Sequence, residues 1–314
     1  RDSAVSGIGI IANPHSKLNK RNPERQELLG YIIGQQGKLE ITQDLSELQR
    51  AAANFKNTSI DVLGINGGDG TISRTLTAII REYGDKPLPK IAILTGGTIN
   101  MLASNLNIKG KPEEILYRLV EAGSDIDAIP KQEIGTLKVG DDYGFMLATG
   151  VAPNFLKEYY KKKSGPIGAV WLICKTWLSW FVKGKLFHRI IRSEILQIKP
   201  KGFPKIRHST LAFFAATVEK MPIGTKQFEL QNYEYTGFSC LSYLVKPRQI
   251  VFKLLRLIFG SHKKTENLLM KLQTEQLEIV TERELQYTLD GEIYANNEGR
   301  LKIETGPRIQ FLVV

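Results

Sequence analysis

The chain has 314 residues, of which 42% are hydrophobic and 24% are charged, a composition that allows one or two substantial cores and excludes a disordered or collagen-like chain. Its 43 Lys and Arg residues exceed its 32 Asp and Glu residues, so the formal net charge is +11 and a negatively charged partner is expected: a nucleic acid, a phosphorylated ligand or an anionic membrane. The two cysteines, Cys174 and Cys240, have no paired spacing, which argues against a disulfide framework or a zinc cluster and indicates a reducing, intracellular compartment.

The amino-terminal segment 1–9 has no apolar signal core and begins without Met, so we expect that a leader has been removed. The longest apolar stretch, 169–182, is interrupted by Lys175 and is too short to span ~30 Å of hydrocarbon. These features predict a cytoplasmic protein that associates with membranes peripherally, if at all.

The first part of the chain alternates short apolar runs with amphipathic stretches, the pattern of a parallel sheet covered by helices. One helix is expected to start with Asn22 as cap and Pro23 as first residue, and another with a capping box formed by Asp44 and Glu47. Strands are predicted at 7–12, 39–42, 60–65 and 90–94, and helices at 23–35, 45–56, 72–81, 99–106 and 112–122.

Beyond residue 125 the pattern changes to alternating strands with hairpin signals, which predicts a second, mainly antiparallel domain. We place the first domain at 1–127 and the second at 128–304, and expect the apolar run 305–314 to pack back onto one of them. The strands predicted in the second domain are 135–139, 143–149, 189–198, 210–218 and 276–289, and two basic amphipathic segments lie at 155–185 and 246–264.

The segment 64–71 reads Gly-Ile-Asn-Gly-Gly-Asp-Gly-Thr and lies between an apolar strand and a helix start. Glycines there let the backbone approach a ligand, and the free amides of a helix N-terminus point toward anionic oxygens. The segment matches neither GxGxxG nor GxxxxGK[ST]. For this loop alone, a tight turn with Asp69 as a solvated cap is the alternative interpretation.

Two more polar loops follow predicted strands, at 13–16 and 95–100. Because the loops after parallel strands emerge at one edge of an open sheet, all three are expected to converge where such sheets bind ligands. This convergence favours a phosphate-binding site over three unrelated turns.

Four motifs, Asn13-Pro-His-Ser16, Gly67-Gly-Asp-Gly-Thr71, Gly97-Thr-Ile-Asn100 and Asp290-Gly-Glu292, resemble those of the diacylglycerol kinase catalytic domain family, in the same order. This family is shared with sphingosine and ceramide kinases and bacterial lipid kinases. The resemblance covers nearly the whole chain. It implies an α/β fold with an N-terminal open, mainly parallel nucleotide-binding sheet with helices, and a C-terminal mainly antiparallel β-sandwich domain for the lipid.

The resemblance also implies that ATP and Mg²⁺ bind in the cleft between the two domains. Asp69 is expected to organise the metal and the phosphates. The residues expected to contact ATP are Asn13, Pro14, Ser16, Thr42, Gly67, Gly68, Asp69, Gly70, Thr71, Ile72, Ser73, Gly97, Thr98 and Asn100.

The sequence Asp290-Gly291-Glu292 follows a predicted strand and places a glycine between two carboxylates. A lipid hydroxyl is a weak nucleophile at neutral pH, so a nearby carboxylate that accepts its proton is expected, together with magnesium on the phosphates. The resemblance suggests Glu292 or Asp290 as the general base, and the residues do not distinguish them. A plain hairpin turn is the alternative for this motif alone.

One of the departures from the family pattern concerns the metal. Met101 follows Asn100 where many members have an Asp, so a carboxylate that helps hold the metal in those members is missing. This departure is the main argument for a lipid-binding protein that has lost catalysis.

The leading hypothesis is a lipid kinase with diacylglycerol as acceptor, followed by a sphingoid base or ceramide. A soluble NAD kinase is the enzymatic rival, since Gly-Gly-Asp-Gly-Thr also occurs there. The expected partners are ATP, a lipid with a free hydroxyl and an anionic membrane surface contacted through 159–185 and 246–264. No nucleic-acid motif is present, and the sequence leaves open whether the chain forms a homodimer.

Overall fold

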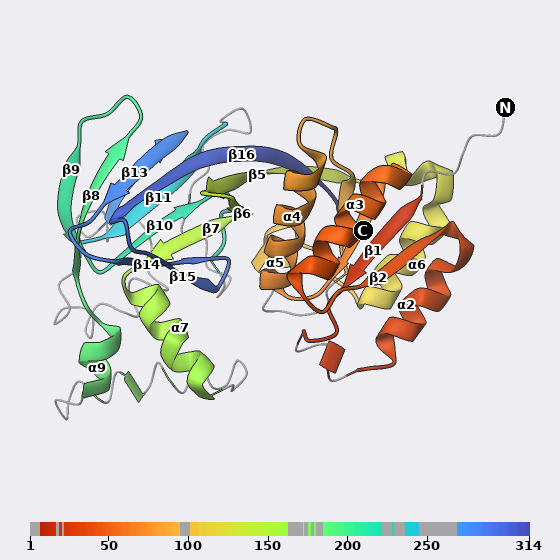
Figure 1. Cartoon of the computed structure of the whole chain (residues 1–314), viewed down its shortest axis with the longest axis horizontal. Coiled ribbons are helices and arrows are strands. Elements are labelled where there is room, and N and C mark those ends of the chain that lie inside the picture. Colours follow the sequence, from red (N-terminus) through yellow and green to blue (C-terminus); the bar gives the residue numbers. More distant parts are fainter. Residues whose placement is uncertain are drawn as a thin grey trace.

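The structure is a computed structural model, and it shows a helix-covered sheet at one end and layered strands at the other (Figure 1). It describes residues 7–16, 19–20, 22–94, 101–162, 172, 175–176, 179, 185–221, 228, 236–244 and 269–314.

Four parallel strands form the amino-terminal part of the first sheet. Their order in space is β2, β1, β3, β4, so the chain leaves β1 toward one edge and returns to its other side. The boundary between β1 and β3 is therefore the point where strand order reverses, which in open α/β sheets is the usual ligand site. The bounds are β1 Ile8–Ala12, β2 Gly37–Ile41, β3 Val62–Asn66 and β4 Lys90–Ile93.

Helices cover both faces of these strands (Figure 1). One buried cluster joins α3, α4 and α5 to one face, and another joins α2 and α6 to the opposite face. Burial on both faces explains why β1 and β3 are buried along their whole length and, apart from Asn66 at the end of β3, do not alternate apolar with polar residues. The helices are α2 Arg25–Ile33, α3 Leu45–Thr58, α4 Asp69–Tyr83, α5 Met101–Asn105 and α6 Pro112–Ala122.

The predicted helix starts are confirmed at α3 and wrong at α2. At α3, the Asp44 carboxylate accepts the Glu47 amide at 2.9 Å, and the Glu47 carboxylate accepts the Gln43 amide at 2.7 Å. At α2, the amide of Arg25 donates to the Asn22 carbonyl at 3.1 Å, so Pro23 lies in a turn and the helix begins two residues later than predicted.

The second part is a sandwich of two antiparallel layers, which confirms the predicted fold class. One layer has the order β12, β11, β10, β7, β14, β15; the other continues the first sheet through β16, β13, β8 and β9, with β5 paired to β16 and β6 paired to β5. The bounds are β5 Lys131–Val139, β6 Asp142–Gly144, β7 Met146–Thr149, β8 Glu194–Pro200, β9 Ile206–Thr210, β10 Ala212–Ala216, β11 Phe238–Tyr243, β12 Leu269–Thr274, β13 Gln276–Val280, β14 Leu285–Leu289, β15 Glu292–Asn296 and β16 Arg300–Leu312.

Three predicted strands differ from the observed ones. The predicted strand 143–149 is interrupted at Phe145, because β6 stays in the first sheet while β7 enters the second. The predicted strand 276–289 likewise divides into β13 and β14, which belong to different sheets. The start of predicted strand 189–198 belongs to α9 (Lys185–Ile190), whose Phe187 and Ile190 are buried three positions apart on one helix face.

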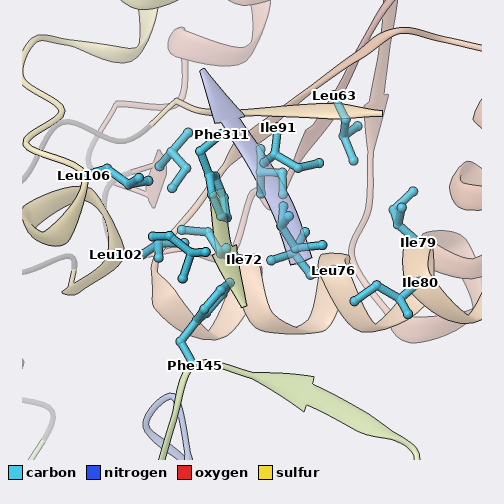
Figure 2. Close-up of a cluster of buried hydrophobic side chains, with 14 of the residues drawn as sticks. Leu63, Ile72, Leu76, Ile79, Ile80, Ile91, Leu102, Leu106, Phe145 and Phe311 are labelled. Atoms are coloured by element: carbon cyan, nitrogen blue, oxygen red, sulfur yellow. The ribbon is translucent and has the colours of Figure 1, made fainter. Parts of the chain in front are cut away.

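The last strand, β16, runs through both parts of the molecule (Figure 1). Residues 300–304 pair with β13, residues 303–312 pair with β5 across a register shift between Thr305 and Arg308, and Phe311 and Leu312 pair in parallel with β4. Figure 2 shows Phe311 and Phe145 entering the cluster under α4, beside Ile72 and Leu102. The two parts therefore share a hydrophobic core.

A further helix, α7 (Val151–Lys162), follows β7 and lies with α9 on the outer side of the second sheet (Figure 1). Within the ranges that the structure describes, no helix has the length and apolar character needed to cross a bilayer.

Candidate active site

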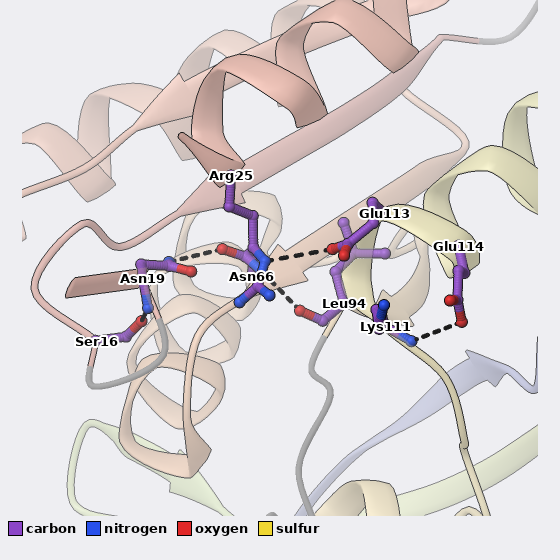
Figure 3. A network of polar contacts seen from close by, with 8 residues as sticks. All are labelled: Ser16, Asn19, Arg25, Asn66, Leu94, Lys111, Glu113 and Glu114. Atoms are coloured by element: carbon purple, nitrogen blue, oxygen red, sulfur yellow. Dashed lines mark hydrogen bonds and ion pairs between the residues drawn. The ribbon is translucent and has the colours of Figure 1, made fainter. Parts of the chain in front are cut away.

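Two buried asparagines fix the carboxyl ends of the central strands. The side-chain amide of Asn66, at the end of β3, donates to the Leu94 carbonyl after β4 at 2.7 Å, and Asn19 donates to the Asn66 side-chain oxygen at 2.6 Å (Figure 3). The Asn13 amide after β1 donates to the Asn66 carbonyl at 3.1 Å. Three loops therefore begin from one connected edge, as the convergence argument requires.

Asn13 and Thr71, predicted to contact the nucleotide from different loops, lie together. The Asn13 side-chain amide donates to the Thr71 hydroxyl at 3.2 Å, while its side-chain oxygen accepts the His15 amide at 2.8 Å and so shapes the turn that contains Pro14. The Ser16 hydroxyl accepts the backbone amide of Asn19 at 3.3 Å. The turn after β1 is thus tied to the glycine segment after β3.

Thr42 follows β2 at the same edge, where its amide donates to the Ala12 carbonyl at 3.0 Å. Ile72 is buried in the core and the Ser73 hydroxyl donates to the Tyr143 carbonyl at 2.9 Å, so these two side chains are engaged within the protein. Any contact of Ile72 or Ser73 with ATP is therefore expected through the backbone. Gly97, Thr98 and Asn100 lie outside the described residues.

The glycine segment passes into helix earlier than predicted. Helix α4 begins at Asp69, three residues before the predicted start, and Gly68 precedes it in an extended conformation with φ −87°. The first-turn amides of a helix have no intrahelical acceptors and attract anions. A Cβ atom added at Gly68 would meet no atom of the described residues within 4 Å, so there is open space beside this residue at the start of α4.

Asp69 is not a solvated cap, so that interpretation was wrong. Its carboxylate crosses to α5 and accepts the amides of Met101 and Leu102 at 3.1 and 3.5 Å. Burial raises the pKa of Asp69 to about 6, although these two hydrogen bonds lower it. Mg²⁺ in kinases is usually held by one or two carboxylates together with the substrate phosphates, so the carboxylate of Asp69 is of the type expected for the metal role that the resemblance implies. The Met101 side chain is buried in the core.

Asp290 holds the break between β6 and β7. Its carboxylate accepts the Phe145 amide at 3.0 and 3.1 Å and the Met146 amide at 2.9 Å, and its backbone adopts φ 48° in the turn before β15. Burial raises the pKa of Asp290 to about 7, and the charge of Asp69 adds to this increase. Because its oxygens are occupied by backbone amides, the geometry favours Asp290 as a positioning residue over a proton acceptor.

Glu292 reaches from the sandwich to the glycine segment. Its Oε2 lies 2.7 Å from the guanidinium of Arg74 on α4, and a Cβ atom built at Gly70 would lie 2.5 Å from its Oε1. Glycine at position 70 is therefore what allows this carboxylate to rest against the first turn of α4. The side chain is 37% exposed, which leaves it accessible to a substrate.

Sequence reasoning missed Arg74 and Tyr160. Arg74 lies four residues after Gly70, a helical spacing that could have placed it at the same end of α4. The Tyr160 hydroxyl on α7 donates to the Gly291 carbonyl at 2.8 Å, and no sequence signal pointed to this contact. Burial raises the pKa of Tyr160, and the charge of Glu292 raises it further, so the two groups interact electrostatically.

Within the described ranges, no group of three or more His, Cys, Asp or Glu side chains forms a metal cluster. Two pairs of titratable groups in the site interact: the charge of Asp69 raises the pKa of Asp290, and the charge of Glu292 raises the pKa of Tyr160.

The buried acids predict a pH-dependent stability. Between about pH 4 and pH 7 the folded protein retains protons on Asp290 and Asp69 that the unfolded chain has released, so the free energy of unfolding should fall as pH rises and then level off. In the Asp290→Asn variant, the free energy of unfolding should fall by up to about 4 kcal/mol less over this pH range. Urea unfolding at pH 4 and pH 8 measures it, with the exposed Asp125→Asn as control; an unchanged difference between the two pH values would contradict the assignment.

Comparisons with known proteins agree on one family. Residues 8–129 match the sequence model of the diacylglycerol kinase catalytic domain. Probable lipid kinase YegS of Salmonella arizonae is 24% identical over 193 residues, which are 59% of this chain and 59% of that protein. Probable lipid kinase YegS-like of Stenotrophomonas maltophilia is 30% identical over 104 residues, which are 32% of this chain and 34% of that protein. The match thus spans less than two thirds of the length of either relative.

The fold is similar over a greater length. The crystal structure of a diacylglycerol kinase from Bacillus anthracis covers 98% of this chain with 97% of its own length, at a TM-score of 0.66 and 13% sequence identity. At 13% sequence identity, this structural similarity shows that the two chains share a fold.

Proposed function

We propose, from the premise that residues 8–129 belong to the diacylglycerol kinase catalytic domain family, that this protein transfers the γ-phosphoryl group of ATP to a lipid hydroxyl. The observation that carries the proposal is the contact of Glu292 with Gly70 and Arg74, which brings a carboxylate of the sandwich to the nucleotide motif. Diacylglycerol, giving phosphatidic acid, is the default acceptor, and a sphingoid base or ceramide is second.

Each group then has a role. The first-turn amides of α4 bind the phosphates, and Asn13 and Thr71 hold the neighbouring turn in place. Asp69, with the nucleotide phosphates, would hold Mg²⁺, which supplies charge neutralisation at the transferred group. Glu292 accepts the proton of the lipid hydroxyl, while Asp290 fixes the turn that presents it.

The proposed division of labour follows the two parts of the fold, with 1–127 binding ATP and 128–304 binding the lipid. The carboxyl-terminal pairing of β16 with β4 returns the chain to the ATP-binding part. Arg74 and Glu292, from the two parts, would then meet at the reaction site.

A phosphate transfer assay tests the proposal directly. Radiolabelled ATP and extracted total lipid should yield a labelled lipid whose identity names the acceptor. Transfer of label to NAD, with none to lipid, would favour the NAD kinase alternative. If ATP hydrolysis and phosphate transfer are both absent while vesicle binding is intact, the result would favour a lipid-binding protein without catalysis.

Membrane association is proposed on the cytoplasmic surface, where ATP is available. Most of 159–185 and all of 246–264 lie outside the described residues, but Tyr160 and Lys161 at the end of α7 are exposed. Each Lys or Arg near an anionic surface contributes about 1 kcal/mol. Sedimentation with vesicles should therefore require anionic lipid and weaken in high salt, and replacing Lys161, Lys162 and Lys163 with Gln should reduce it. Binding indifferent to lipid charge and to salt would contradict electrostatic docking.

A further inference from the structure

The Asp290-Gly291-Glu292 motif lies at the turn of a tight hairpin. Leu289 at the end of β14 pairs with Glu292 at the start of β15, so only Asp290 and Gly291 connect the two strands. Both connecting residues have positive φ, 48° and 87°, which the favoured two-residue hairpin turn requires. Glu292 is thus the first residue after the turn, and the direction of its side chain depends on how the turn is held.

Each residue of the motif is held by a different element. Asp290 accepts backbone amides at the break between β6 and β7, and Glu292 pairs with Arg74 of α4. The carbonyl of Gly291 accepts the hydroxyl of Tyr160 at 2.8 Å from α7, which lies against the hairpin (Figure 1). The middle of the turn therefore depends on a helix that the proposed chemistry does not otherwise use.

The Tyr160 hydrogen bond acts on the peptide unit that precedes Glu292. This unit contains the Gly291 carbonyl and the Glu292 amide, and because a peptide unit is planar, holding its oxygen also restricts the orientation of that amide. Gly291 has no Cβ, so its own backbone restricts the unit little. A Cβ atom built at Gly291 would lie 3.7 Å from the Tyr160 hydroxyl oxygen, so the end of the ring is in contact distance of the turn.

The phenol of Tyr160 keeps its proton at neutral pH. Burial raises the pKa of Tyr160, and Glu292, Tyr159 and Asp69 raise it further, from a value that is already about 10 for a free tyrosine. The hydroxyl is therefore available as a hydrogen-bond donor to Gly291. The charged side chains that line a surface pocket together with Tyr160 are Lys157, Glu158, Lys161, Arg189 and Arg192.

We propose that Tyr160 is a positioning residue for phosphoryl transfer, because its hydrogen bond to Gly291 holds the turn so that the Glu292 carboxylate reaches the acceptor hydroxyl. The inference rests on the proposed function, which assigns the hydroxyl proton to this carboxylate. A general base must lie within hydrogen-bond reach of the proton that it takes, and a small displacement of a reacting group lowers the rate of the chemical step. The effect of Tyr160 should therefore appear in kcat and not in the KM for ATP.

The Tyr160→Phe variant keeps the ring and removes only the hydroxyl. In the transfer assay with extracted total lipid, its apparent kcat should fall about tenfold, the size expected when a reacting group loses one positioning hydrogen bond. The KM for ATP and the thermal midpoint should change little, since Tyr160 is 46% exposed. Tyr117→Phe, at a 58% exposed tyrosine of α6, is the matched control and should keep the wild-type kcat. A wild-type kcat in Tyr160→Phe would overturn the proposal.

A double-mutant cycle separates positioning from a direct effect on the lipid. If Tyr160 acts through Glu292, the Tyr160→Phe change should add little to the loss of kcat in the Glu292→Gln variant, which has no base left to position. Equal losses with and without the Glu292 carboxylate would show that Tyr160 acts independently of it. That result would also overturn the proposal.

A fluorinated tyrosine at position 160 tests the hydrogen-bond donor itself. 3,5-Difluorotyrosine keeps the shape of the ring, but its phenol ionises at lower pH than that of tyrosine, and absorbance follows the ionisation. The ratio of its kcat to the wild-type kcat should be near one while the phenol is protonated, and should fall to the Tyr160→Phe level as the phenolate forms, because a phenolate cannot donate. A ratio that stays constant across the ionisation would contradict a role for the hydrogen bond.

Hydrogen exchange examines the turn without turnover. Amides of residues 290–293 should exchange about tenfold faster in Tyr160→Phe, while the exchange of β1 and β3 stays unchanged. Unchanged exchange at the turn would show that Tyr160 does not hold it and would overturn the proposal. If the wild-type protein transfers no phosphate to any lipid, the proposed function is overturned, and the catalytic role of the turn with it. Normal kcat of Tyr160→Phe in a protein that does transfer phosphate would overturn the positioning role alone.

Discussion

The Glu292→Gln variant is expected to lower phosphoryl transfer roughly 10²-fold or more while ATP still binds. Glutamine keeps the size of the side chain beside Gly70 but cannot accept the hydroxyl proton, and general-base assistance is typically worth 10²- to 10⁴-fold. The loss should appear in kcat at saturating lipid and ATP. Nucleotide affinity, measured separately by calorimetry, should change little because the proposed phosphate site is formed by the first-turn amides of α4.

The control for this variant is Glu298→Gln, which alters an exposed carboxylate six positions further along the same part of the chain. It should leave kcat unchanged. The Asp290→Asn variant should also reduce kcat, because the turn that presents Glu292 loses an anchor, but it should alter the pH dependence of stability as well. Near-normal turnover in Glu292→Gln would remove this residue from the chemistry.

The Gly68→Val variant is expected to weaken ATP binding by about 100-fold or more, or at least about 2.7 kcal/mol. The backbone at Gly68 has a φ of −87°, which valine adopts readily, and within the described ranges no atom lies within 4 Å of the added Cβ. The valine side chain would instead occupy the open space at the start of α4 that we assign to phosphate. Calorimetric titration with ATP measures the loss, and Gly68→Ala should fall between valine and wild type.

Thermal unfolding shows whether the Gly68→Val protein remains folded. Gly7→Val is the matched substitution at the opposite end of β1, where an added Cβ makes an ordinary 3.8 Å contact with Ile60. It should leave ATP affinity intact. A folded Gly68→Val protein with unchanged ATP affinity would mean that the nucleotide phosphates bind elsewhere.

Local sequence signals predicted much of the amino-terminal part correctly. Helix α6 has the predicted bounds because Pro112 favours its first position and Gly123, with φ 50°, ends it. The start of α3 is also set by local hydrogen bonds, because Glu47 bonds to Asp44 and Gln43, which lie three and four residues before it. By contrast, the break at Phe145 depends on Asp290, which is 145 positions away, and no local pattern encodes it.

The same distinction applies to the site. The motifs after the strands predicted which segments converge, because strand order alone brings them to one edge. They did not predict that α4 would start within the glycine motif or that Asp69 would turn inward. The pair of Arg74 with Glu292 spans 218 positions and the Tyr160 contact with Gly291 spans 131, so both depend on how the sandwich meets the helices.

The path of β16 also has a consequence for folding during synthesis. Strands β1 to β4 are translated early, yet one side of β4 is paired with Phe311 and Leu312 at the other extreme of the chain. Until the ribosome has released those residues, the backbone of β4 presents an unpaired edge of the kind that promotes intermolecular association. The helix-covered sheet is therefore completed only after β16 has been made, so its maturation depends on residues that follow most of the sandwich along the chain.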